Sequence, residues 1–331
     1  MRSLRFVLFT VALLAALASA CGSTPAEQQQ RRVRERAEAQ AAKGQKQAAM
    51  PVADAAPVTL ARLEDSAIVE SSGIVASRRN PGVFWTHNDS GDTARVFAFD
   101  REGRSRGTFR VEGAQARDWE DIAAGPGPAQ GQTYLYVGDI GDNRRVREQV
   151  VVYRFPEPEL KADAAVGAAL STEPAEAIRL KYPDGPHNAE ALLVHPSTGD
   201  LYVVTKMAGG ADVYKLAAPF SAEGVHTLAR VATLNGPESF GMLITGGDIS
   251  PDGGRVALCD YLQAYELTLP AGSKSFDEIW GQTPVVVPIG VRGTGIGEAI
   301  CYRLDGAALL ATSEGDHPPL IEIALLPRQK R

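Results

Sequence analysis

The segment WEDIAAG (residues 119–125) is one of five similar segments, and their repetition decides the fold. Each begins with a small or acidic pair, continues with Ile or Leu, and ends in short strand-forming residues. The other four are SSGIVAS (71–77), AEALLVH (189–195), GGDISPD (246–252) and GEAICYR (297–303). The anchors Ile74, Ile122, Leu192, Ile249 and Ile300 are 48, 70, 57 and 51 residues apart. Such internal repetition is typical of solenoids and propellers.

Each segment is followed by a turn rich in Gly, Pro, Asn or Asp and then by further strand-like runs. Four units have four predicted strands. The fifth has three before the chain ends, and an unused strand, PVTLARL (57–63), precedes the first unit. Closure of the last unit by this N-terminal strand would remove an exposed sheet edge. We therefore predict an all-β domain over 57–327, a five-bladed β-propeller. The 70-residue interval leaves room for a sixth blade as the alternative.

The N-terminus has the pattern of a lipoprotein signal peptide over residues 1–20. Two arginines precede an apolar run, residues 6–17, which is shorter than the roughly 20 residues of a membrane-spanning helix. Small residues then lie directly before Cys21. We predict that Cys21 is lipidated and anchors an extracytoplasmic protein to a bacterial cell membrane, the outer membrane in a Gram-negative cell. An ordinary signal peptide cut after Ala20 is the alternative.

Residues 21–56 contain few large apolar side chains, so we predict that the lipidated cysteine is followed by a disordered tether. The other two cysteines, Cys259 and Cys301, lie in strand-like runs of neighbouring units. In an oxidising compartment they could form a disulfide, and two buried, unpaired cysteines are the alternative. The net charge of -6 and the lack of a basic stripe argue against a nucleic-acid partner.

Acidic residues recur in the loops that a propeller gathers at one mouth of its central channel. These loops precede the first strand and follow the second strand of each blade. The predicted metal ligands in them are Asp89, Glu120, Asp139, Asp142, Asn143, Glu190, Asp248 and Glu298. Crowded carboxylates repel one another, by roughly 4 kcal/mol for a pair 4 Å apart at a dielectric constant of about 20, so they need a neutralising partner. Oxygen ligands without cysteine suit Ca²⁺ first and Mg²⁺ or Mn²⁺ next.

Two of these loops, NDSGD (88–92) and GDIGDN (138–143), can also be interpreted as ordinary turns, in which Asp, Asn and Gly are preferred. The histidine that precedes the first loop, His87, and Asp139 in the second are the candidate catalytic residues. Either could act as a base toward water. Lys206, which follows a predicted second strand, is a candidate partner for the acids.

The runs SGIVASRRNPGVFWTHNDSGD (72–92) and GEAICYRLDGAALLATSEG (297–315), with DWEDIAAGP between them, resemble bacterial secreted or lipid-anchored β-propeller proteins. These are mostly uncharacterised and loosely related to phytase-like esterase and NHL/WD-like propellers. A weaker likeness is to gluconolactonase-type propellers, which bind a divalent cation and hydrolyse lactones or phosphoesters. That likeness implies ligand roles for Glu120, Asn143, Asn188 or Asp248.

Two functions from different classes follow from these features. The first is a membrane-anchored binding module that grips a protein, a glycan or a small molecule, with a divalent cation at the acidic mouth. The alternative is a metal-dependent hydrolase of esters, lactones or phosphoesters. A serine hydrolase is disfavoured because the sequence has no Gly-x-Ser-x-Gly nucleophile motif.

Overall fold

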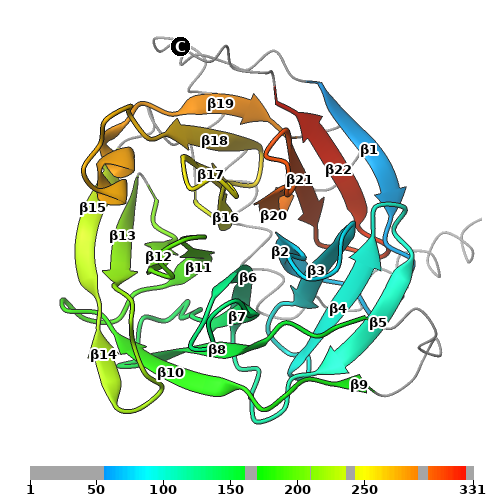
Figure 1. Ribbon diagram of the computed structural model, residues 1–331, viewed down its shortest axis with the longest axis horizontal. Helices are drawn as coiled ribbons and strands as arrows, with labels where there is room; N and C mark the ends of the chain where they lie inside the picture. The colour runs from blue at the N-terminus through cyan, green and yellow to red at the C-terminus, as the bar shows by residue number, and fades with distance from the viewer. Residues whose placement is uncertain (1–55, 161–169, 209, 236–242, 290–296, 326–331) are drawn as a thin grey trace, which may run out of the picture. The chain divides into compact units, whose positions relative to one another are not determined.

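The computed structural model describes residues 56–160, 170–208, 210–235, 243–289 and 297–325 as a five-bladed β-propeller (Figure 1). Five sheets surround one axis, and the first strand of each blade lies nearest to it. The predicted all-β class and the five blades are confirmed. The predicted signal peptide, Cys21 and the tether lie outside the described residues. None of the described helices is long and apolar enough to span a membrane.

Each blade has four antiparallel strands, ordered from the axis outward. The first blade consists of β2 (Ser71–Ala76), β3 (Val83–Asn88), β4 (Arg95–Asp100) and β5 (Ser105–Arg110). The second consists of β6 (Trp119–Pro126), β7 (Thr133–Asp139), β8 (Val150–Pro156) and β10 (Glu176–Lys181). The third consists of β11 (Ala189–Val194), β12 (Leu201–Thr205), β13 (Gly210–Leu216) and β15 (Ala229–Asn235). The fourth consists of β16 (Gly246–Ile249), β17 (Arg255–Cys259), β18 (Gln263–Thr268) and β19 (Val285–Pro288).

The fifth blade joins the two ends of the domain. It consists of β20 (Gly297–Tyr302), β21 (Ala308–Ser313), β22 (Pro319–Ala324) and the N-terminal strand β1 (Pro57–Arg62). β1 pairs with β22 in antiparallel fashion, with Pro57 opposite Ile323 and Arg62 opposite Pro319. The N-terminal strand therefore closes the ring as predicted, and β22 has a partner along its outer edge.

Connections between third and fourth strands reach back to the preceding blade. β9 (Leu170–Ser171) pairs in parallel with β5, and β14 (Val225–Thr227) pairs in parallel with β10. The 3₁₀ helix η1 (Phe276–Gly281) packs against β15. The 70-residue interval is thus explained by the long connection that contains β9, and the sixth blade of the alternative prediction is wrong.

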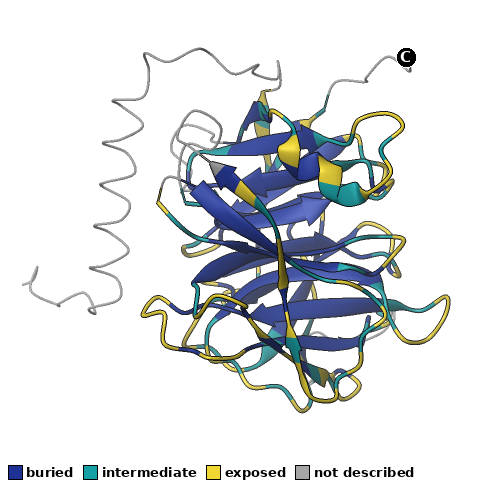
Figure 2. Ribbon diagram, turned by 90° about the vertical axis from the view of Figure 1, so that its left-hand side faces the viewer, coloured by how far each residue is buried: buried dark blue, intermediate teal, exposed yellow. Residues whose placement is uncertain are grey.

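The core consists of five apolar clusters, each between two adjacent blades. Trp85 of β3 and Trp119 of β6, for example, are buried between the first and second blades. Buried residues follow the strands and exposed residues the turn tips (Figure 2). Because the inner strands are buried on both faces, they form a rigid ring on which the loops of the channel mouth are built.

Candidate metal centre

Strand order brings the acidic loops together at one channel mouth. The first strand of a blade starts there and the second strand ends there, so these two chain segments are neighbours in every blade. In four blades a backbone hydrogen bond joins them directly, and in the fourth blade it runs from Thr245 N–H to Cys259 O (2.9 Å). In the first three blades the bonds are from Asp89 N–H to Glu70 O (3.1 Å), from Gly141 N–H to Asp118 O (3.2 Å) and from Lys206 N–H to Asn188 O (2.9 Å).

A β-bulge at the same place in four inner strands inserts one extra residue near the mouth. The extra residues are Ser72, Glu120, Glu190 and Glu298. The fourth blade is regular, and Gly247 pairs there with Leu258 without a shift of register. Bulges redirect a side chain and are frequent beside functional sites. The three glutamates at the predicted equivalent positions are therefore brought to one mouth by one repeated backbone feature.

Three carboxylates at this mouth form a close triad. Oxygen atoms of Asp89, Asp118 and Glu120 lie within 4.8 Å of one another. Across the described chain, no Lys or Arg lies within ion-pair distance of these three side chains. Burial, followed by the charge of Glu190, raises the pKa of Asp89 to about 8. Burial likewise raises the pKa of Asp118 to about 6 and that of Glu120 well above its ordinary value.

The fourth acid of the mouth, Glu190, is neutralised by a lysine. Lys206 Nζ lies 2.5 Å from Glu190 Oε2, and both side chains are largely buried. Burial alone would lower the pKa of Lys206, but Glu190, Tyr261 and Glu298 raise it well above its ordinary value. Nζ also lies 5.1 Å from the ring centroid of Tyr261. The mouth thus combines an unpaired acidic triad with one fixed positive charge.

Gly141 has no side chain, and its backbone therefore leaves room for the carboxylates of Glu120 and Asp118. A Cβ atom there would lie 2.1 Å from Glu120 Oε1 and 2.5 Å from Asp118 Oδ2. The two carboxylates therefore contact the main chain directly, which only glycine permits. Three anionic oxygen donors, without cysteine or histidine, fit a hard divalent cation such as Ca²⁺ or Mg²⁺. Asp89, Asp118 and Glu120 would hold it.

Two predicted ligands in the GDIGDN loop are held by an arginine instead. Asp139 Oδ1 lies 2.7 Å from Arg147 Nη2, and Asp142 Oδ2 accepts a hydrogen bond from Arg147 N–H at 2.6 Å. Arg147 Nη1 also donates to Gly141 O at 2.7 Å. Arg147 is 7% exposed, so this buried side chain closes the loop and fixes Gly141 beside the triad. Asn143 lies at the tip, where its Oδ1 is 3.4 Å from Asn188 Nδ2.

Asp248 is not part of the triad and is held by backbone N–H groups. Its Oδ1 accepts from the N–H of Ile249 and its Oδ2 from the N–H of Tyr302 in the next blade, at 2.8 and 2.9 Å. Asp121, which aligns with it in the second blade, has the same arrangement. Its Oδ1 accepts from Ile122 N–H and its Oδ2 from Leu192 N–H, at 2.8 and 2.9 Å. These aspartates join neighbouring blades.

His87 and the two predicted cysteines are buried away from solvent. His87 is fully buried, its Nδ1 lies 2.8 Å from Asn88 O, and burial lowers its pKa to about 4. The ring packs edge-on against Trp119. Cys259 and Cys301 are free, buried thiols, and burial raises the pKa of each. Cys259 Sγ lies 3.7 Å from Gly246 O and from Glu298 O.

Two residues of the mouth were not among the predicted ligands or partners. Asp118 completes the triad, and its signal was its place directly before the WEDIAAG repeat. Tyr261 contacts Lys206 from the loop after β17. Only the structure indicates its role, because a tyrosine after a strand is common and no repeat marks it.

Comparison with known proteins finds a likeness to solved structures. No family model matches the chain. No curated protein matches it either. A solved structure of a luciferin-regenerating enzyme is 9% identical, with 82% of this chain and 96% of that chain covered and a TM-score of 0.43. At this identity and TM-score the likeness carries no argument about function, which has to come from the site.

Proposed function

We propose that the protein binds a divalent cation, Ca²⁺ first, at the Asp89–Asp118–Glu120 triad and hydrolyses an ester, lactone or phosphoester there. The observation that carries the proposal is the triad itself. Its oxygens lie within 4.8 Å of one another, and no cation of the described chain pairs with them. Such a cluster needs protons or a metal ion to relieve its repulsion.

Lys206 favours hydrolysis over binding alone. Its ammonium group is held by Glu190 beside the triad, where it can donate a hydrogen bond to negative charge that develops on a substrate oxygen. Asn188 Nδ2 donates to Glu190 Oε1 at 3.2 Å and so orients this acid toward Lys206. A bound divalent cation would supply Lewis-acid polarisation of the carbonyl or phosphoryl oxygen.

The first experiment measures the cation and turnover separately. We expect Ca²⁺ or Mg²⁺ to raise the melting temperature of the wild type, and Asp118→Asn or Glu120→Gln to weaken cation binding at least tenfold by calorimetry. Glu223→Gln, which changes an exposed acid in a distant loop, should bind the cation like the wild type. A panel of aryl esters, lactones and phosphoesters then tests for cation-dependent hydrolysis.

The outcomes separate the two functions. Absence of cation binding would remove both. If the cation binds but none of the substrate classes is turned over, the protein is better described as a cation-dependent binding module. Loss of turnover in Lys206→Met, with cation binding intact, would support the hydrolase.

We also propose that lipidation of Cys21 presents this site outside the cytoplasm at a membrane surface. The support is the sequence pattern before Cys21. Labelling with a radioactive fatty acid tests it. Cys21→Ser should abolish the label and release the protein into the soluble fraction, and a labelled Cys21→Ser protein would contradict the proposal.

A further inference from the structure

Three arginines on the lip of the mouth have no acidic partner. Arg117, Arg144 and Arg145 are exposed, and among the described residues no carboxylate lies within ion-pair distance of them. They all belong to the second blade, and Arg117 directly precedes the triad member Asp118. Burial raises the pKa of Asp118, and the charges of Arg147 and, to a smaller extent, Arg117 lower it.

Several other exposed arginines of the domain have acidic partners, whereas Arg62 and Arg179 donate to backbone carbonyls instead. The ion pairs are Arg79–Glu159, Arg101–Glu322, Arg104–Asp100 and Arg110–Glu112. Three unpaired arginines in one blade, beside a close group of acids in a protein with a net charge of -6, make a local excess of positive charge. Their charge is therefore available to a ligand.

The backbone fixes two of these arginines on the lip. The loop that follows β7 turns at Asp142, whose carbonyl accepts from Arg145 N–H at 2.8 Å. Arg145 has a φ of 53°, the left-handed region that non-glycine residues seldom adopt. The buried Arg147 anchors the end of the same turn through Asp142 and Asp139. Strained conformations of this kind are frequent at ligand-binding sites.

We propose that Arg117, Arg144 and Arg145 bind an anionic group of the substrate, so that the substrate is an ester that carries a phosphate or a carboxylate. The inference rests on the proposed function, because it places the ester group at the triad and its charged group on the arginine lip. Guanidinium groups bind phosphate and carboxylate with paired, charge-assisted hydrogen bonds. Because the acidic triad and the three arginines occupy separate places at the mouth, the site would select a substrate that carries a negative charge beside its scissile bond.

The test uses phenyl phosphate and benzoate as probes of the cation-loaded, full-length protein. Binding is measured by calorimetry for the wild type, for R144E/R145E and for the control R101E/K274E. The control makes the same change of net charge in turns at the opposite face. We expect the R144E/R145E variant to bind a probe at least tenfold more weakly, with the control and the affinity for the cation unchanged. The probe that binds the wild type more tightly identifies phosphate or carboxylate as the preferred group.

Each outcome decides between the proposals. A wild type that binds the cation but neither probe, or equal binding by both variants, overturns the arginine lip and leaves the metal centre intact. Absence of cation binding overturns the proposed function itself. Val146, next to the arginines, is 63% exposed, so vesicles containing anionic lipid are tested in parallel. Loss of vesicle binding in R144E/R145E without any probe binding would identify a membrane contact and overturn the inference.

Discussion

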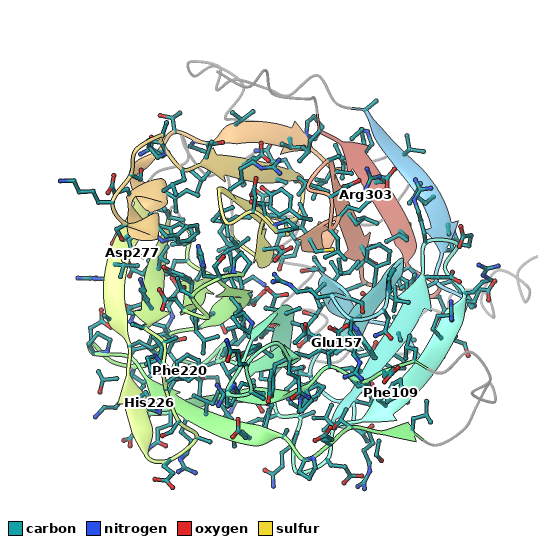
Figure 3. All side chains as sticks on the ribbon, in the orientation of Figure 1. Phe109, Glu157, Phe220, His226, Asp277 and Arg303 are labelled. Atoms are coloured by element: carbon teal, nitrogen blue, oxygen red, sulfur yellow. The ribbon has the colours of Figure 1, made fainter. Side chains whose placement is uncertain are left out.

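Two groups of buried carboxylates in this propeller differ in what satisfies their oxygens. The bridging acids are Asp121, Asp248 and Glu157, and each accepts hydrogen bonds from a neighbouring blade. Glu157, labelled in Figure 3, accepts from Trp85 Nε1 at 2.9 Å and from Arg79 N–H at 3.1 Å in the first blade. The mouth acids are Asp89, Asp118 and Glu120, whose oxygens lie close to one another, although the charge of Arg147 offsets part of the repulsion at Asp118.

The contrast separates structural acids from a ligand site. A buried carboxylate that accepts several N–H bonds is satisfied by the fold, and its removal leaves donors without partners. A carboxylate that faces other carboxylates opposes folding until a cation or a proton joins it. Sequence position alone does not distinguish the two groups, since Glu120 and Asp121 are adjacent.

The largest expected effect comes from changing these two adjacent residues. Asp121→Ala leaves the buried N–H groups of Ile122 and Leu192 without acceptors, at about 1–3 kcal/mol each, so we expect a loss of about 4 kcal/mol in the free energy of unfolding. Glu120→Ala should change the stability of the cation-free protein by less than about 1 kcal/mol, because it also removes repulsion. Urea unfolding of both variants in EDTA measures the difference, and equal losses would erase the distinction between the groups.

A second expected effect is a pH dependence due to Asp89. Its pKa is about 8 in the folded protein and 3.8 as its ordinary value, so between these limits the unfolded chain binds fewer protons. Rising pH from 4 to 8 therefore weakens folding through this group, progressively and by several kcal/mol at most. Relative to wild type in EDTA, Asp89→Asn should become progressively more stable over that range.

Thermal unfolding at pH 5, 6.5 and 8 checks this dependence. Added Ca²⁺ should stabilise the wild type more at pH 8 than at pH 5, since it replaces protons on the triad. Glu223→Gln serves as the control for removing an exposed acid. If the difference in unfolding free energy between Asp89→Asn and wild type does not change with pH, the pKa of Asp89 is not raised in the folded protein.

The sequence allowed the architecture to be predicted because the propeller repeats. Five aligned segments with one orphan strand define the ring closure, and the register of Glu120, Glu190 and Glu298 follows from the same alignment. The split of residues 225–235 into β14 and β15 could not be predicted, because β14 pairs with a different blade.

The site was harder to predict than the fold because partners decide the role of an acid. GDIGDN has the composition of a ligand loop, but Asp139 and Asp142 are held by Arg147, a residue distinguishable from Arg144 and Arg145 only by its burial. Asp248 aligns with the mouth but lies among backbone N–H groups. In each case the deciding contact is with a group that bears no motif.

The smallest expected effect tests the cradle under the triad. Gly141→Ala adds a Cβ 2.1 Å from Glu120 Oε1, so the carboxylates must move away from their common centre. Since φ at Gly141 is not in the left-handed region and the obstructed atoms are side-chain ends, the fold should tolerate the change. We expect cation affinity to fall about tenfold, or about 1.4 kcal/mol, with the unfolding free energy nearly unchanged. Gly281→Ala is the matched control, because a Cβ there meets no atom within 4 Å. If calorimetric titration gives the same cation affinity for wild type and both variants, the cation does not bind at the triad. The mouth acids and the bridging acids would then differ in their packing but not in cation binding.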